Sequence, residues 1–248
     1  MTRPESAEVV VHTGHDHGGD APFVIVPGIG MSHRYSVRLH DELARTATVL
    51  SLDLPGFGGL PRPSERMSVP DYARAIARTL DDRRIGRAVL IGHSMGAQFS
   101  VELARQRPHL VERLVLAAPV VDPHRRTARQ QSLDLLRDLV LESPSAAALV
   151  TADYVRTGPR WFFTEVRSML AYRTEEAISG VACPVLVLRG ENDPIARRGW
   201  CYDLAHRAAD GELAEIAKAG HVLQHTASER VARAIMAFAA RDVQNTPR

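Results

Sequence analysis

The stretch Arg87-Ala-Val-Leu-Ile-Gly-His-Ser-Met-Gly96 decides the fold. Its four apolar residues from Ala88 to Ile91 form the short continuous run that is typical of a parallel strand covered on both faces. A Gly-x-Ser-x-Gly turn follows directly, and residues 97–104 after it have a helical pattern. Such a turn holds the backbone of its serine in a strained conformation and presents the hydroxyl above the edge of the sheet. The sequence therefore predicts an exposed Ser94 between a buried strand and a helix.

Length and composition are those of an ordinary globular protein with one large domain. The 248 residues are 45% hydrophobic and 24% charged, which suits an α/β domain with a sizeable core. The formal net charge of +2 is too small to indicate a nucleic-acid partner or an anionic membrane. The sequence indicates no particular oligomeric state.

Two further features bear on the compartment. No apolar run approaches the length of a membrane span, and the segment from Met1 to Glu8 lacks the apolar stretch of a secretory signal. Cys183 and Cys201 do not have metal-ligand spacing, so we expect both to be free thiols. These observations favour a cytoplasmic protein that does not bind membranes.

Apolar runs and helical patterns alternate along most of the chain. Strands are expected at 9–11, 23–26, 49–52, 88–91, 114–118, 184–189 and 212–216. Helices are expected after Ser32, whose hydroxyl would cap the helix start, over 69–83, over 97–104 and near the C-terminus. This alternation is typical of a mostly parallel sheet with helices on both faces. Three histidines, His12, His15 and His17, lie between the first two strands. We expect a solvated hairpin loop there rather than a metal site.

The alternation breaks between residues 119 and 181. Helical patterns such as the run from Ala146 to Val150 occur there, without a convincing strand. This predicts a helical cap formed by 119–181, inserted into a core domain formed by 1–118 and 182–248. We expect the apolar side chains of the cap to pack mainly on one another and on the core, with a minority lining a substrate pocket. The aromatic residues of this segment are Tyr154, Trp161, Phe162, Phe163 and Tyr172.

Three residues of complementary chemistry, Ser94, Asp193 and His221, each follow a predicted strand. A serine hydroxyl needs a base to become a nucleophile at neutral pH. The imidazole in turn needs a third group that holds its tautomer and stabilises its charged form. Serine, acid and histidine are therefore required together, and their order along this chain is that of the α/β-hydrolase fold.

From about Phe23 to Ala239 the chain resembles members of the α/β-hydrolase superfamily. The resemblance lies in four motifs in the expected order: Asp53-Leu-Pro-Gly-Phe-Gly58, Gly92-His-Ser-Met-Gly96, Leu188-Arg-Gly-Glu-Asn-Asp-Pro194 and Ala219-Gly-His221. It implies the α/β-hydrolase fold, with Ser94 as nucleophile, His221 as base and Asp193 as its acidic partner. The backbone N–H groups of Ile29 and Met95 would form the oxyanion hole. Many members carry His-Gly where this chain has Pro27-Gly28, a change that retains the backbone donor of Ile29.

Other residues compete for some of these roles. Asp122 follows an earlier strand, at a place that some members use for the acid, but the turn at Asp193 fits the motif better. His225 and His93 are interpreted as structural. Asp53 is expected to hydrogen-bond backbone and shape the rim of the site.

The resemblance implies a cofactor-independent serine hydrolase that acts on a small-molecule ester, thioester or related carbonyl compound through an acyl-enzyme. We expect no cofactor and no metal. Carbon–carbon bond hydrolysis, acyl transfer and perhydrolysis use similar serine sites, so they remain alternatives. A further alternative, from a different class, is a ligand-binding sensor with little turnover.

Overall fold

A computed structural model describes residues 8–18 and 21–241, and its architecture is a seven-stranded sheet in the order β1-β3-β2-β4-β5-β6-β7. All neighbouring strands are parallel except β1, which is antiparallel to β3. The strands are β1 (Val10–Thr13), β2 (Phe23–Val26), β3 (Val49–Asp53), β4 (Ala88–His93), β5 (Val111–Ala117), β6 (Val185–Gly190) and β7 (Gly211–Ile216). The predicted α/β-hydrolase fold is confirmed.

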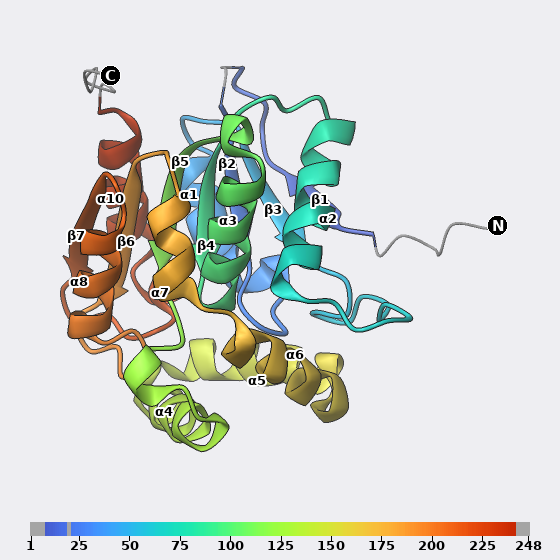
Figure 1. The fold of residues 1–248 in the computed structure, drawn as a ribbon, viewed down its shortest axis with the longest axis vertical. Helices are drawn as coiled ribbons and strands as arrows, with labels where there is room; N and C mark the ends of the chain where they lie inside the picture. Colours follow the sequence, from blue (N-terminus) through green and yellow to red (C-terminus); the bar gives the residue numbers. More distant parts are fainter. Residues whose placement is uncertain (1–7, 19–20, 242–248) are drawn as a thin grey trace.

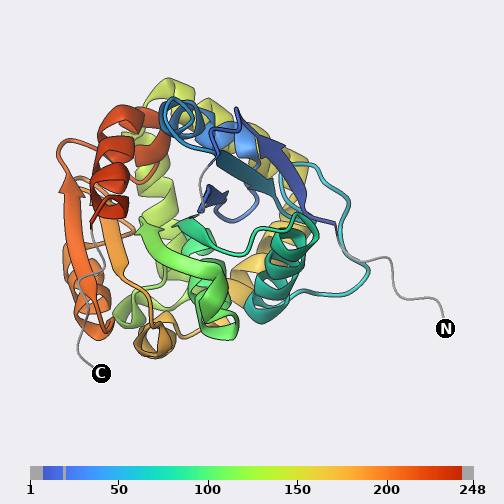
Figure 2. The ribbon, with the colours of Figure 1, turned by 90° about the horizontal axis from the view of Figure 1, so that it is seen from above.

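Helices cover both faces of the sheet (Figure 1), and the view from above shows the two layers (Figure 2). Helices α1 (Val37–Leu43) and α10 (Ser228–Ala239) pack together on one face, while α2 (Val69–Asp82) and α3 (Met95–Gln106) pack together on the other. The chain also forms α8 (Arg198–Arg207), which packs on β6 and β7, and the short α9 (Leu223–Thr226). Ser68 begins α2 with a reciprocal capping box to Asp71, which satisfies backbone donors at the helix start.

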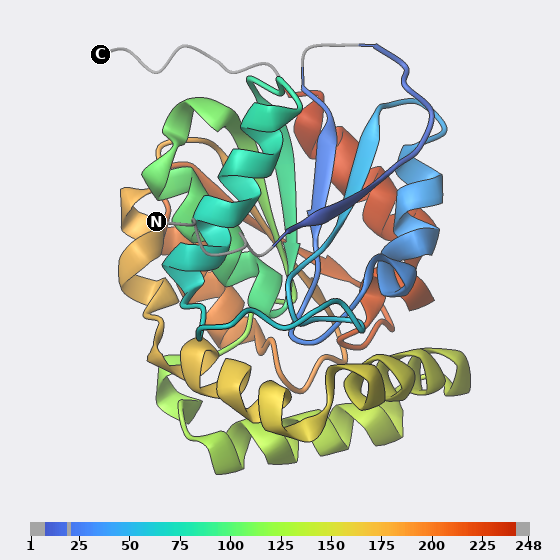
Figure 3. The ribbon, with the colours of Figure 1, turned by 90° about the vertical axis from the view of Figure 1, so that its right-hand side faces the viewer.

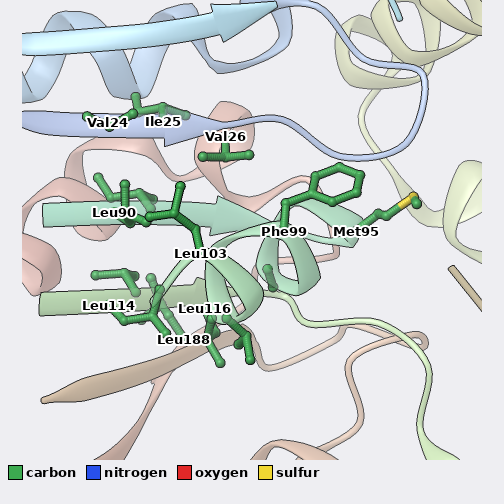
Figure 4. Packing of buried hydrophobic residues seen from close by; sticks show 14 of the residues in the cluster. Val24, Ile25, Val26, Leu90, Met95, Phe99, Leu103, Leu114, Leu116 and Leu188 are labelled. Carbon is green, nitrogen blue, oxygen red and sulfur yellow. The ribbon is translucent and has the colours of Figure 1, made fainter. Parts of the chain in front are cut away.

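The core lies between the central strands and α3 (Figure 4). Leu90 of β4, Leu114 of β5 and Leu188 of β6 are fully buried, as is Phe99 of α3. Strands β2, β3, β4 and β6 are buried along their whole length. These strands are mostly apolar because both faces of a parallel sheet are covered by helices.

The chain between β5 and β6 is helical; most of its helices lie beyond one end of the sheet, while α7 (Thr174–Ala177) packs on α3 (Figures 1 and 3). It comprises the 3-10 helix η3 (Pro123–Arg125), α4 (Ala128–Leu141), α5 (Pro144–Thr157), α6 (Pro159–Ala171), α7 and the 3-10 helix η4 (Ile178–Gly180). We call it the helical segment. It falls inside the range 119–181 predicted for a cap. The division of the chain into two domains stays a prediction, and residues 1–7, 19–20 and 242–248 of the predicted core lie outside the described residues.

Buried hydrogen bonds attach α5 to the loop that follows β2. Asp153 of α5 is fully buried and accepts from the backbone N–H and the hydroxyl of Ser32, at 2.8 and 2.7 Å. Thr157 donates its hydroxyl to the carbonyl of Gly30 at 2.8 Å. Because these groups are shielded from water, leaving one unpaired would destabilise the fold. The helical segment is thereby held in a defined position over the sheet edge.

Two local expectations are wrong. The first two strands do not form a hairpin, because β1 pairs with β3 on the outer side of the sheet. Ser32 does not cap a helix: the chain continues into a 3-10 helix, η1 (His33–Ser36), and the Ser32 hydroxyl is already bonded to Asp153. Cys183 and Cys201 are free thiols, as expected. Among the described residues, the structure contains no helix long and apolar enough to cross a membrane.

Candidate active site

Ser94 lies where β4 ends and α3 begins, in a backbone conformation that L-residues rarely adopt. Its φ is 55° and its ψ is −120°, and its N–H donates to the carbonyl of Ala117 on β5 at 2.9 Å. A Cβ at Gly92 would lie 2.7 Å from Cα of Ala97, and one at Gly96 would collide with the carbonyl oxygen of Val26. The two glycines are required because strand and helix approach too closely for side chains.

His221 links Ser94 to Asp193. Its Nε2 lies 3.2 Å from Ser94 Oγ, and its Nδ1 lies 2.9 Å from Oδ2 of Asp193. Since an ionised carboxylate only accepts, Nδ1 carries the proton and Nε2 is left to accept from the hydroxyl. All three residues are buried, so the expectation of an exposed Ser94 is wrong: the serine lies in the wall of a pocket instead. The structure thus brings together the three side chains that the sequence singled out.

Asp193 is held as a carboxylate by several donors. Burial alone would raise the pKa of Asp193, but the neighbouring His221 and the backbone N–H groups of Ile195 and Ala196 lower it below its usual range. Burial likewise opposes the charge of His221, yet the carboxylate of Asp193 outweighs this and raises the pKa of the imidazole above its usual range. The pair therefore favours the charged form of the histidine.

Arg189 supports the turn that carries Asp193. This buried arginine donates to the carbonyl of Ala196 at 2.7 Å and pairs with Glu215 of β7. The sequence pattern did not single it out. The feature of the sequence that could have indicated its role is its position at the end of a buried strand, directly before the Gly190–Pro194 turn.

The loop after β2 passes close to Ser94. A Cβ at Gly28 would lie 3.1 Å from Cβ of Ser94, and Ile29 lines the adjoining pocket. In the part of the chain that the structure describes, neither Ile29 nor Met95 uses its backbone N–H in a hydrogen bond. Met95 is also the first residue of α3, where the helix dipole favours negative charge. Two donors are therefore available beside the serine.

A mainly apolar pocket of about 690 Å³, its open mouth included, lies over Ser94 and His221. The helical segment contributes much of its wall. Of the predicted aromatic residues, Tyr154 and Phe162 line it, whereas Phe163 is exposed and Tyr172 bonds to Glu102. The lining residues are Gly28, Ile29, Met31, Tyr35, Ser94, Val120, Gln131, Ser132, Leu135, Asp138, Val150, Tyr154, Phe162, Val166, Met169, Ile195, His221 and Val222. No arginine or lysine is among these described residues.

Asp138 is the one acidic residue of that lining, and the sequence did not indicate it. It is buried, and its Oδ1 accepts from the backbone N–H of His221 at 3.3 Å. Burial raises the pKa of Asp138 to about 6. The pocket therefore contains a carboxylate that becomes charged within the physiological pH range.

His93 is buried behind the site and already has two protein partners. Its Nε2 donates to the carbonyl of His221 at 2.9 Å, and its Nδ1 accepts from the hydroxyl of Tyr35. Burial, together with the nearby His221, lowers the pKa of His93 to about 3. A neutral histidine with both nitrogens engaged supports the backbone of His221.

The remaining candidates lie apart from this arrangement. Asp122 accepts from the backbone N–H of His124 and so caps η3, while Asp193 is the carboxylate bonded to His221. His225 lies in α9 with its Nε2 3.3 Å from the hydroxyl of Ser145. Asp53 accepts from the backbone N–H of His33, in line with the expectation that it bonds to backbone.

Comparison with known proteins gives the family. Residues 23–234 match the model of the alpha/beta hydrolase family. The (E)-2-((N-methylformamido)methylene)succinate hydrolase of Acinetobacter baylyi is 26% identical over 90% of this chain and 92% of its own length. An enol-lactonase from Burkholderia xenovorans has the same fold, with a TM-score of 0.81 at 20% identity over 96% of this chain and 98% of its own. An N-acyl homoserine lactone degrading enzyme has a TM-score of 0.80 at 19% identity, over 95% and 98% of the two chains. The chain belongs to the alpha/beta hydrolase family.

Proposed function

We propose that the protein is a cofactor-independent serine hydrolase that cleaves an ester, thioester or related carbonyl compound through an acyl-enzyme. The observation that carries this proposal is the hydrogen-bonded series from Ser94 Oγ through His221 to Asp193. In it, Ser94 is the nucleophile, His221 the general base and Asp193 the group that orients and stabilises the imidazolium. The lactonases of the same fold act on cyclic esters, which is compatible with this chemistry.

The steps follow from the positions of the donors and acceptors. Ser94 Oγ attacks the carbonyl carbon while its proton passes to Nε2 of His221. The N–H groups of Ile29 and Met95 then stabilise the oxyanion, and one such donor is worth roughly 3 kcal/mol in the transition state. His221 returns the proton to the leaving group, which leaves an acyl group on Ser94. Water, activated by the same imidazole, releases the acid.

The pocket favours an uncharged substrate under a cap formed by the helical segment. Its wall is mainly apolar, and its ionisable side chains include Asp138 but no arginine or lysine among the described lining residues. A carboxylate on the substrate would meet the like charge of Asp138 without an arginine or lysine to pair with it. The Acinetobacter baylyi relative is named as a hydrolase of a substituted succinate, which is a dicarboxylate. For this chain we propose a different substrate, one without a carboxylate.

Labelling with a fluorophosphonate tests the nucleophile. Wild-type protein should gain a single adduct on the peptide that contains Ser94, measured by intact-mass and peptide mass spectrometry. The adduct should be absent in Ser94→Ala and weakened in His221→Ala. Ser94→Ala should lower kcat on short p-nitrophenyl esters by about 10⁴–10⁶-fold, because triad members act as a unit. A folded wild-type protein that stays unlabelled, or is labelled elsewhere, would refute the proposal.

A matched pair of aspartate variants tests the acid. Asp193→Asn keeps the shape of the side chain but disturbs the tautomer of His221, so turnover should fall by up to about 10⁴-fold. Asp122→Asn should have little effect, since its carboxylate caps η3 instead. Steady-state kinetics with circular dichroism as a check on folding measures both. The reverse ranking would assign the acid to Asp122.

The pH dependence of kcat/KM tests the base. His221 must be neutral to accept a proton, and Asp193 raises the pKa of His221, so activity should rise with pH through a midpoint above the usual value of about 6.5. His225→Gln should leave this midpoint unchanged, because that residue lies outside the series of hydrogen bonds. A profile that stays flat from about pH 6 to pH 10, with chemistry limiting, would remove His221 from this role.

A pair of p-nitrophenyl esters tests the pocket polarity. At about pH 8, above the pKa of Asp138, a neutral acyl chain should be preferred over the same chain ending in a carboxylate by at least about tenfold in kcat/KM. Asp138→Asn should reduce this preference, since it removes the like charge. Equal rates for both esters in the wild type would overturn the assignment of an uncharged substrate.

A further inference from the structure

A second cluster of ionisable side chains lies beside the loop that carries Ile29. His12 Nε2 and His33 Nδ1 each lie 2.8 Å from the same oxygen, Oδ2 of Asp53. The two imidazole rings are stacked, with centroids 3.4 Å apart and planes inclined by 22°. The residues come from β1, from η1 and from the end of β3, so three separate segments converge on one point.

The strand register explains why His12 reaches Asp53. In the antiparallel pair of β1 and β3, Val10 is opposite Asp53 and His12 is opposite Ser51. Residues two apart on a strand share one face, so His12 and Asp53 are diagonal neighbours on that face. The turn after β2 then brings His33 to the same side. None of this follows from the spacing of the histidines along the chain.

We propose that His12, His33 and Asp53 form a binding site for a divalent transition-metal ion, with Zn²⁺ the best match. Two imidazole nitrogens and one carboxylate oxygen are a common ligand set for zinc. The three ligand atoms lie within 4.8 Å of one another. With ligand distances of ~2.0 Å, tetrahedral geometry needs the ligand atoms about 3.3 Å apart. Each nitrogen, now 2.8 Å from Oδ2, would move outward by about half an ångström. The two stacked rings would also tilt apart, so that the ion lies in the plane of each imidazole.

The surroundings of the cluster suit an ion that enters from solvent. Oδ1 of Asp53 accepts the backbone N–H of His33, which fixes the carboxylate and leaves Oδ2 as the ligand. The side chains of His12 and His33 are 38% and 26% exposed, so water can complete the coordination. On binding, each imidazole moves its proton from the ligating nitrogen to the other ring nitrogen.

A bound ion would connect β1, β3 and the residues that follow the Gly28–Ile29 loop. An ion that binds the folded state alone stabilises the protein by an amount that grows with the logarithm of its concentration once that exceeds Kd. The neighbouring histidines do not take part: His17 contacts the carbonyl of Ala44, and His15 lies beside His17. This separation provides a matched control, since His15 is an exposed histidine from the same segment of chain.

The test uses tag-free, full-length protein stripped with a chelator. Isothermal titration with ZnCl₂ should give one site per chain, and zinc should raise the melting temperature. Co²⁺ should produce the visible absorption bands of a tetrahedral complex. His12→Gln and His33→Gln should each weaken zinc binding by at least about tenfold, whereas His15→Gln should not. Mg²⁺ should have no effect, because it prefers oxygen ligands in octahedral geometry.

Circular dichroism would show that each variant is folded. Absence of zinc binding to the wild type would overturn the proposal. So would binding that is lost equally in His15→Gln, or that survives in both His12→Gln and His33→Gln. These readouts do not depend on hydrolytic activity, so they stand apart from the proposal that Ser94 is a nucleophile.

Discussion

The close approach of β4 and α3 is the constraint on which the rest of the site depends. It places Ser94 in a left-handed backbone conformation and requires a glycine at position 92, while the approach of α3 to the end of β2 requires Gly96. Strain of this kind persists only where the surrounding packing holds it. Here the central strands and Phe99 of α3 form that packing (Figure 4). A strained turn that is anchored in the core can present a side chain at a constant position.

The buried pair of His221 and Asp193 is the second feature on which the site depends. Burial disfavours the charged forms of both His221 and Asp193, yet their mutual attraction overcomes this penalty. Backbone N–H donors hold Asp193 as a carboxylate, and His93 stays neutral. His221 is therefore the member of this group whose charge can change. Only His221 is positioned to gain or lose a proton between Ser94 and Asp193. The geometry and the electrostatics thus favour the same proposed base.

The helical segment supplies much of the pocket wall and is fixed to the core. Its attachment through Asp153 and Thr157 reaches the loop that carries Ile29, so the wall of the pocket and the proposed oxyanion donor share one support. The candidate zinc ligands lie on the other side of the same loop, at His33. Both sets of contacts therefore act on the loop between β2 and η1.

Local patterns in the sequence predict the alternation of strands and helices, the strand–turn–helix around Ser94, and the candidates Ser94, Asp193 and His221. Continuous apolar runs, glycine pairs and motif order involve neighbouring residues, so they can be recognised without the fold. The partner of β1, the burial of Asp138 beside His221, and the meeting of His12, His33 and Asp53 are visible in the folded protein alone. These depend on strand order and on how helices pack over the sheet edge. Contacts between residues far apart in the chain leave no periodicity in the sequence.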